Sequence, residues 1–188
     1  TTRASRVRPT SSTSPLNGKN RVLNRDLRRV VVGVGNRFRG DDAVGLRVTE
    51  RLEGRIPRDV ELIESDGDPV DLIAAWERAE LSVVIDAVVT GGKPGTIYRF
   101  NGDHRLPAGF FRRSSHLLGL ADAVELARTL NRLPGELVIV GVEAGTVEQG
   151  ADMSTSVERS VGRVVELVLS LLESPSAEEN GAVGVANA

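Results

Sequence analysis

One stretch of the chain, residues 28–47 (RRVVVGVGNRFRGDDAVGLR), limits what the protein can fold into more than any other. It begins with a β-branched run, Val30–Val34, and continues through a glycine-rich turn to two adjacent carboxylates, Asp41 and Asp42, at the predicted start of a helix. A strand, a tight turn and a helix in this order are typical of open α/β proteins, in which ligands bind at the carboxyl ends of the strands. We therefore expect a functional site at this turn.

The turn lacks the residues that a nucleotide phosphate requires. A dinucleotide-binding turn would place a third glycine three residues after Gly35, where this chain has Phe38. A P-loop would continue from Gly40 with Lys and then Ser or Thr, and Asp41 and Asp42 stand there instead. Two carboxylates repel a phosphate, although they suit a hard or borderline metal ion. Capping of the helix and metal binding both stay open for this pair, and a nucleotide-binding α/β module is a disfavoured alternative.

Charge is unevenly distributed along the 188 residues, a length that favours a single domain with a sizeable core. Residues 1–29 contain eight Lys or Arg and one Asp, so the formal net charge of −2 leaves −9 for the remainder. An acidic body argues against nucleic acid as a partner. The absence of cysteine excludes disulfides, thiolate nucleophiles and Cys-based zinc sites. No apolar run indicates a membrane span or a secretion signal, and we expect a cytoplasmic protein without a membrane partner.

The two ends of the chain differ in composition from the part between them. Residues 1–27 are basic and rich in Ser and Thr, and they contain too few apolar groups to offset the entropy of ordering. We expect a disordered arm there and a second flexible tail at residues 174–188. The folded domain is predicted to span residues 28–173.

Strand and helix patterns alternate within this predicted domain. Apolar runs and alternation predict five strands, at Val30–Val34, Val60–Ser65, Leu81–Ala87, Thr96–Phe100 and Glu136–Val142. Helical spacing of apolar residues predicts four helices, at Asp42–Arg55, Pro69–Ala79, Ser115–Leu130 and Ser154–Glu173. The pattern indicates an α/β three-layer sandwich, with a mostly parallel five-stranded sheet between helices on both faces. The turn before Thr96–Phe100 is too short for a helical crossover, so this strand is expected to run antiparallel to the third, at an edge.

Several acidic residues follow the predicted parallel strands, at one edge of the sheet. Asp42 follows the first strand, Asp66 and Asp68 the second, and Glu143 the fifth, while Asp86 ends the third. A carboxylate within an apolar strand costs free energy unless something satisfies it, and the residues after Asp86 do not form a turn. We therefore predict a functional role for Asp86.

His116 is one of two histidines in the chain. Ser115 suits the N-cap of the predicted helix, which would place His116 in the first turn, where the helix dipole disfavours imidazolium and keeps the ring available to a metal. A surface or packing role stays open for His116. His104 lies in a polar turn and is expected to have no role. No serine lies in a Gly-x-Ser-x-Gly turn, so the sequence does not indicate a serine nucleophile.

Stretches quoted in chain order resemble one known family. GVGNRFRGDDAVGLRV is similar to the Gly-x-Gly-Asn…Asp-Asp/Glu-x-x-Gly opening of the [NiFe]-hydrogenase maturation endopeptidases. VVIDAV, SSHLLGLADAV and GELVIVGVE resemble later segments of that family, and the similarity covers residues 29–173. The resemblance implies the strand order 2-1-3-5-4, with strands numbered along the chain and right-handed crossovers.

The resemblance also implies a site and an activity. Asp42, Asp86 and His116 match the positions at which the family contacts nickel, although many members carry Glu where Asp42 stands. The implied activity is removal of a short C-terminal extension from the precursor of a [NiFe]-hydrogenase large subunit after nickel insertion. The nickel is then supplied by the precursor and binds the free enzyme weakly, and we expect a monomer. A nickel-site checkpoint or chaperone protein that binds the precursor without cutting it is the alternative.

The sequence leaves the step of peptide hydrolysis open. A metal could polarise the scissile carbonyl, or a carboxylate could act as a base on water.

Asp41 is expected chiefly to cap the helix, so that its replacement by Ala would cost about 0.5–2 kcal/mol of stability.

Overall fold

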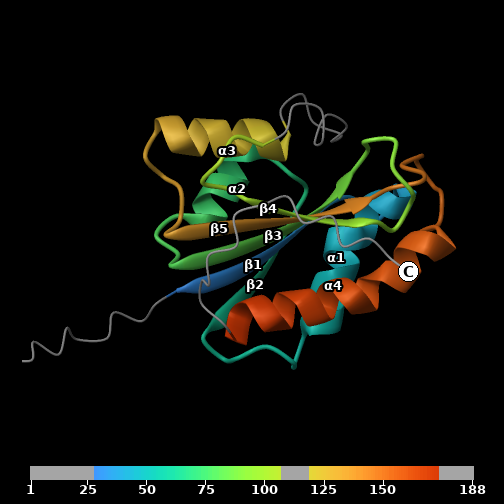
Figure 1. Cartoon of the computed structure of the whole chain (residues 1–188), viewed down its shortest axis with the longest axis horizontal. Coiled ribbons are helices and arrows are strands. Elements are labelled where there is room, and N and C mark those ends of the chain that lie inside the picture. Colours follow the sequence, from blue (N-terminus) through green and yellow to red (C-terminus); the bar gives the residue numbers. More distant parts are fainter. Residues whose placement is uncertain (1–27, 107–118, 174–188) are drawn as a thin grey trace, which may run out of the picture.

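The computed structural model describes residues 28–106 and 119–173, and these contain one sheet with helices on both faces (Figure 1). The strands lie close to the predicted positions: the first, third and fifth are each one residue longer than expected, and the fourth is shifted by one residue. Their bounds are β1 Arg29–Val34, β2 Val60–Ser65, β3 Leu81–Val88, β4 Ile97–Asn101 and β5 Glu136–Glu143. The α-helices are α1 Val44–Leu52, α2 Pro69–Trp76, α3 Leu120–Thr129 and α4 Thr155–Glu173.

The sheet has the order β2-β1-β3-β5-β4, which confirms the predicted order. Strand β1 pairs in parallel with β2 and β3, and β3 pairs in parallel with β5. Strand β4 is the antiparallel edge strand that the short turn before it predicted. Its hydrogen-bonded neighbour is β5, however, and not β3, which precedes it in the chain.

Two apolar cores separate the sheet from the helix layers. Helices α2 and α3 cover one face of the sheet, and α1 and α4 cover the other (Figure 1). Trp76 is fully buried in the first core and Leu52 in the second, while the inward-facing valines of β1 and β3 alternate between the two cores. The predicted three-layer α/β architecture is therefore confirmed. Within the described ranges, no helix combines the length and the apolarity that crossing a membrane requires.

Helices α1 and α3 begin later than their apolar spacing predicted. The turn after β1 forms a short 3-10 helix, Gly40–Ala43, and the α-helix begins only at Val44. The first N–H groups of this turn are drawn toward another loop, since the Asp41 N–H donates to the Thr146 carbonyl at 2.8 Å. Helix α3 begins at Leu120 with Gly119 as its N-cap.

Helices α1 and α2 also end earlier than predicted. Helix α1 stops at Leu52, because Glu53 takes up an extended conformation with a ψ of 129°. Helix α2 stops at Trp76, and Arg78 then has a left-handed φ of 61°. The backbone conformation sets both helix ends, and the spacing of apolar residues does not predict it.

The N-terminal part of α1 lies directly against the backbone of the sheet. A Cβ atom on Gly45 would lie 2.3 Å from the Val34 carbonyl oxygen and 2.5 Å from the Ile85 carbonyl oxygen. Only glycine allows the helix to approach the carboxyl ends of β1 and β3 so closely. This contact sets the height of the 3-10 turn, and with it Asp42, above the end of the sheet.

We predict that Gly45→Ala destabilises the protein, because the added methyl group overlaps backbone atoms that cannot rotate away. The expected loss in the free energy of unfolding is about 1–3 kcal/mol, as for other overpacked cores, measured by urea unfolding. Gly162→Ala is the matched control, since Gly162 is exposed in α4 and its Cβ would meet nothing within 4 Å. That variant should gain about 0.5–1 kcal/mol from helix propensity. Equal effects of the two substitutions would contradict the close-approach interpretation.

Candidate functional site

Asp42 lies in the 3-10 turn that follows β1, at the carboxyl edge of the sheet. Asp42 is 7% exposed, and its backbone N–H donates to the Arg39 carbonyl at 3.1 Å. The turn is tight because Gly35 takes up a φ of +145°, and a Cβ atom there would lie 1.8 Å from the Asp42 carbonyl oxygen. Gly35 thus allows the backbone of Asp42 to fold back over the end of β1.

Asp86 lies near the carboxyl end of β3, the strand next to β1. It is 5% exposed, and within the described part of the chain its carboxylate accepts one hydrogen bond, from the neighbouring Ala87 N–H at 2.8 Å. Burial and, to a lesser extent, the nearby charge of Asp42 together raise the pKa of Asp86 to about 7. Two of the predicted site residues therefore lie close enough for their charges to interact.

The third predicted site residue, His116, lies outside the described residues. Ser115, the predicted N-cap, also lies outside the described residues, so the expected placement of His116 near a helix N-terminus stays a prediction. The described helix α3 begins at Leu120, with Gly119 as its N-cap. The Gly119 N–H donates to the Asp122 carboxylate at 3.0 Å, which stabilises this start.

His104 is at the opposite end of the sheet from Asp42 and Asp86. It follows β4, whose last residue, Asn101, pairs with Val138 near the start of β5. The Arg128 side chain donates to the His104 carbonyl at 3.3 Å, so the backbone of His104 belongs to a turn at the amino edge. His104 cannot join the two aspartates without a rearrangement of the sheet.

Asp41 has a structural role that differs from the predicted helix cap. Neither the 3-10 turn nor α1 has a side-chain cap, and the fully buried Asp41 carboxylate reaches across to the loop between β5 and α4. It accepts hydrogen bonds from the N–H groups of Gly145 at 2.7 Å, Thr146 at 3.0 Å and Ser154 at 2.6 Å. The Ser154 hydroxyl donates a fourth bond at 2.9 Å. Asp41 thus joins the turn that carries Asp42 to the start of α4.

The remaining acidic residues at this edge also shape loops. Asp68 is the N-cap of α2 and accepts from the Val70 N–H at 2.8 Å, and Asp66 accepts from the Asp68 N–H at 3.2 Å. Glu143 is fully buried and accepts hydrogen bonds from the loop that follows β3. The sequence placed these three residues at the correct edge, but it did not indicate which loop each of them serves.

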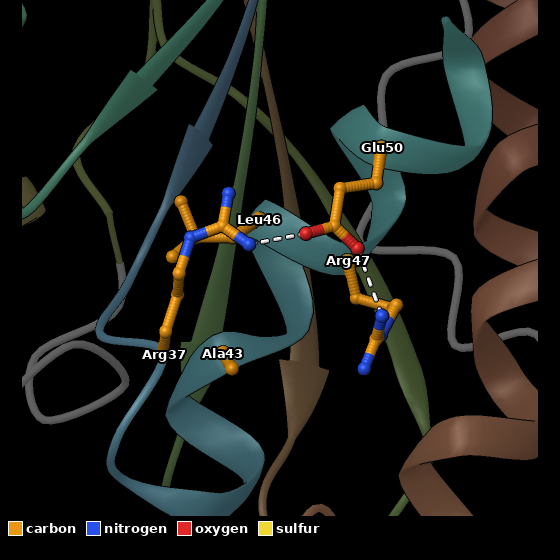
Figure 2. Close-up of a pocket in the computed structure, with 5 residues that line it drawn as sticks. All are labelled: Arg37, Ala43, Leu46, Arg47 and Glu50. Atoms are coloured by element: carbon orange, nitrogen blue, oxygen red, sulfur yellow. Dashed lines mark hydrogen bonds and ion pairs between the residues drawn. The ribbon is translucent and has the colours of Figure 1, made fainter.

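A small open pocket lies beside this turn, on the α1 side, and it is a separate feature from the two aspartates (Figure 2). The Glu50 carboxylate lies between two guanidinium groups, with one oxygen bonded to Arg37 and the other to Arg47 Nη1 at 2.8 Å. The hydrogen bond from Arg37 lowers the pKa of Glu50. Arg37 also donates to Glu64, at 2.7 Å and 2.8 Å. These charges satisfy one another, so the pocket offers no set of free ligands for a metal.

The Asp42–Asp86 pair is suited to a cation or to proton transfer. Two nearly buried carboxylates at short range repel each other, and a divalent cation or a shared proton relieves that repulsion. Residues 28–106 and 119–173 contain no group of three His, Asp or Glu side chains that could hold a metal, so this part of the chain supplies an incomplete ligand set. A metal bound here would need further ligands from elsewhere.

Comparison with known proteins identifies a family for this chain. Residues 46–171 match the family model described as hydrogenase maturation protease. The chain is 31% identical over 156 residues to the hydrogenase 2 maturation protease of Escherichia coli strain K12, covering 81% of this chain and 94% of that protein. The solved hydrogenase maturating endopeptidase HybD from E. coli matches with a TM-score of 0.66 at 30% identity, over 78% of this chain and 92% of that one. The [NiFe] hydrogenase maturation protease HybD from Thermococcus kodakarensis matches with a TM-score of 0.63 at 28% identity, over 77% and 99%.

We predict that Asp41→Asn costs more stability than a lost helix cap. Either orientation of the asparagine amide points its NH₂ group at a backbone N–H donor, on the Gly145–Thr146 side or at Ser154. Buried donors without an acceptor cost about 1–3 kcal/mol each, so the loss in the free energy of unfolding should exceed about 2 kcal/mol. Asp68→Asn is the control, because asparagine caps a helix as well as aspartate does. A loss of less than about 1 kcal/mol for Asp41→Asn would contradict this role, because it would be no larger than the loss of a helix cap.

We also predict a pH dependence of stability that belongs to Asp86. Its pKa is raised from 3.8 to about 7 in the folded protein, so folding takes up a proton between these values. The contribution of Asp86 to stability is therefore fully present below about pH 4 and is lost as the pH rises toward 7. Asp86→Asn removes this loss, and its stability relative to the wild type should rise with pH by at most about 1.4 kcal/mol per unit. Parallel stability curves from urea unfolding between pH 4 and 8 would contradict the raised pKa.

Proposed function

Because the chain belongs to the hydrogenase maturation protease family, we propose that it removes a short C-terminal extension from the precursor of a [NiFe]-hydrogenase large subunit after nickel insertion. The observation that supports this function most directly is the approach of Asp42 and Asp86 to each other at the carboxyl edge of the sheet. The reaction would take place in the cytoplasm, since the precursor polypeptide is synthesised there.

Nickel in this proposal is part of the substrate and arrives with the precursor. Asp42 and Asp86 would contact it together with His116, and two carboxylates with one imidazole suit a borderline divalent ion. The chain alone would bind nickel weakly, because the precursor supplies the other ligands. An incomplete ligand set of this kind would let the enzyme distinguish a nickel-loaded precursor from an empty one.

Asp86 would also exchange a proton during the reaction. Its pKa of about 7 means that the carboxyl group is half protonated near neutral pH and gives up its proton readily when a cation approaches. The same value is close to the optimum for a general acid or base acting near neutral pH. The Ala87 N–H bond to Oδ1 keeps the side chain in one orientation in either state. Polarisation of the scissile carbonyl by the metal and activation of water by a carboxylate both fit this arrangement.

The test is cleavage of a purified [NiFe]-hydrogenase large-subunit precursor, followed on a gel as loss of the C-terminal extension. The nickel-loaded precursor should be shortened, and the same precursor prepared without nickel should remain intact. Equal cleavage of the two would contradict nickel recognition. Binding of the loaded precursor without any shortening would instead support a checkpoint protein and contradict the proposed reaction.

Substitution of the three proposed ligands should reduce cleavage while the protein remains folded. Asp86→Asn, Asp42→Asn and His116→Ala are each expected to lower kcat/KM by about 100-fold or more, because each removes a ligand or a proton acceptor. Asp42→Glu should retain substantial activity, because the related family often has Glu at this position. Asp59→Asn is the control: Asp59 is paired with Arg29, and its side chain is 62% exposed. Full activity of His116→Ala would contradict its place in the site.

A further inference from the structure

Glu143 is a buried carboxylate whose hydrogen bonds, within the described residues, all go to one exposed loop. The loop Thr90–Gly92 follows β3 and is open to solvent, whereas Glu143 beneath it is fully buried. Glu143 Oε1 accepts from the N–H groups of Thr90 at 2.8 Å, Gly91 at 2.9 Å and Gly92 at 3.0 Å. Its Oε2 accepts from the Thr90 hydroxyl at 2.7 Å. Four hydrogen bonds from one short segment compensate for burying the charge.

This loop lies on the same face of the sheet as Asp86. In the parallel β3–β5 pair, Asp86 is opposite Gly141 and Val88 is opposite Glu143. Side chains alternate along a strand, and Val88 and Ile139 both belong to the core under α2 and α3. Asp86 and Glu143 therefore point to this same face from adjacent strands, two register positions apart. The loop folded over Glu143 thus lies next to the candidate site.

The loop is also fixed at its far end, although two adjacent glycines would otherwise leave it many conformations. The Gly95 N–H donates to the Glu143 carbonyl at 2.8 Å, and Arg163 donates to the Gly95 carbonyl at 3.1 Å. The charge of Glu143 is costly to bury, and the bonds that offset this cost also fix the conformation of the exposed loop. A fixed loop has a function if its outer surface must already have the bound conformation before a partner binds.

We infer that Glu143 is a positioning residue, which holds the loop Thr90–Gly92 in the shape that the precursor polypeptide contacts beside Asp86. This inference rests on the proposed function, because it takes the precursor as the partner. Glu143 itself does not touch the substrate. Its effect should therefore appear in the binding of the precursor, and thus in KM, more strongly than in kcat.

Two substitutions of Glu143 separate a positioning role from a merely structural one. Glu143→Gln can keep the loop, because its amide oxygen accepts the three N–H groups and its NH₂ group donates to the Thr90 hydroxyl. The Thr90 hydroxyl, which donates to Glu143 in the wild type, can accept from this NH₂ group, since it lies 3.4 Å from the Tyr98 hydroxyl and can donate to it instead. Glu143→Leu fills the space without any acceptor and should release the loop. We expect KM for the nickel-loaded precursor to rise about tenfold in Glu143→Leu and to stay within about threefold of wild type in Glu143→Gln.

Two further variants complete the experiment. Leu172→Ala removes a buried side chain at the end of α4 that lies in the α1 and α4 core, and it should lower the Tm without changing KM. Lys93→Glu leaves the Glu143 bonds in place and reverses the charge on the exposed continuation of the loop, so it should change KM without changing the Tm. If Glu143→Leu does not fold, a wild-type KM in Lys93→Glu still overturns the inference, and a raised KM supports contact between this loop and the precursor.

Each outcome has a defined meaning. A wild-type KM in both Glu143→Leu and Lys93→Glu would overturn the inference, as would a KM that follows only the Tm across the variants, Leu172→Ala included. A wild-type protein that cuts no nickel-loaded precursor would instead overturn the proposed function. Cleavage by the wild type together with inactive Asp86→Asn and unaffected Glu143→Leu would leave the function standing and remove the role of the loop.

Discussion

The close approach of α1 to the ends of β1 and β3 is the contact on which the candidate site depends. Gly45 permits it, because any side chain at this position would overlap the Val34 and Ile85 carbonyl groups. Ile85 directly precedes Asp86, and the 3-10 turn that carries Asp42 directly precedes α1. The same backbone contact therefore holds both carboxylates at one edge of the sheet, close enough for the charge of Asp42 to raise the pKa of Asp86. A side chain at position 45 would push α1 away from the sheet. The two carboxylates would then lie farther apart, and the charge of Asp42 would raise the pKa of Asp86 less.

Buried carboxylates at this edge fall into two kinds, and their hydrogen bonds distinguish them. Asp41 and Glu143 each accept four bonds, which compensate for their burial and tie loops together. Asp86 accepts one bond in the described part of the chain and lies close to the charge of Asp42, so its pKa rises to about 7. A carboxyl group with its pKa raised in this way is typical of functional sites. Residues 28–106 and 119–173 thus satisfy the supporting carboxylates fully and give Asp86 a single hydrogen bond.

Membership of the hydrogenase maturation protease family favours a peptidase over the checkpoint alternative that the motifs alone left open. The roles of Asp42, Asp86 and His116 stay predictions, since they come from motif similarity and from the geometry of two of the three residues. The separate network of Arg37, Glu50 and Arg47 shows why charge alone is a poor guide (Figure 2). Its charges are largely exposed and mutually paired, and such pairs contribute little to stability.

The sequence by itself determined the order of strands and helices and the edge of the sheet at which acidic residues gather. Apolar periodicity and the glycine-rich turn are local signals, and they correctly placed β2 at Val60–Ser65 and Asp86 near the end of β3. Only the tertiary structure decided which acidic residues approach one another and which serve loops. Asp41 accepts its bonds from residues more than a hundred positions away, and Glu143 from a loop some fifty positions earlier. Partners so distant in the chain leave no pattern around either residue. Hydrogen-bond partners of buried charges are set by how the loops meet in space, because the neighbouring residues in the chain do not supply them.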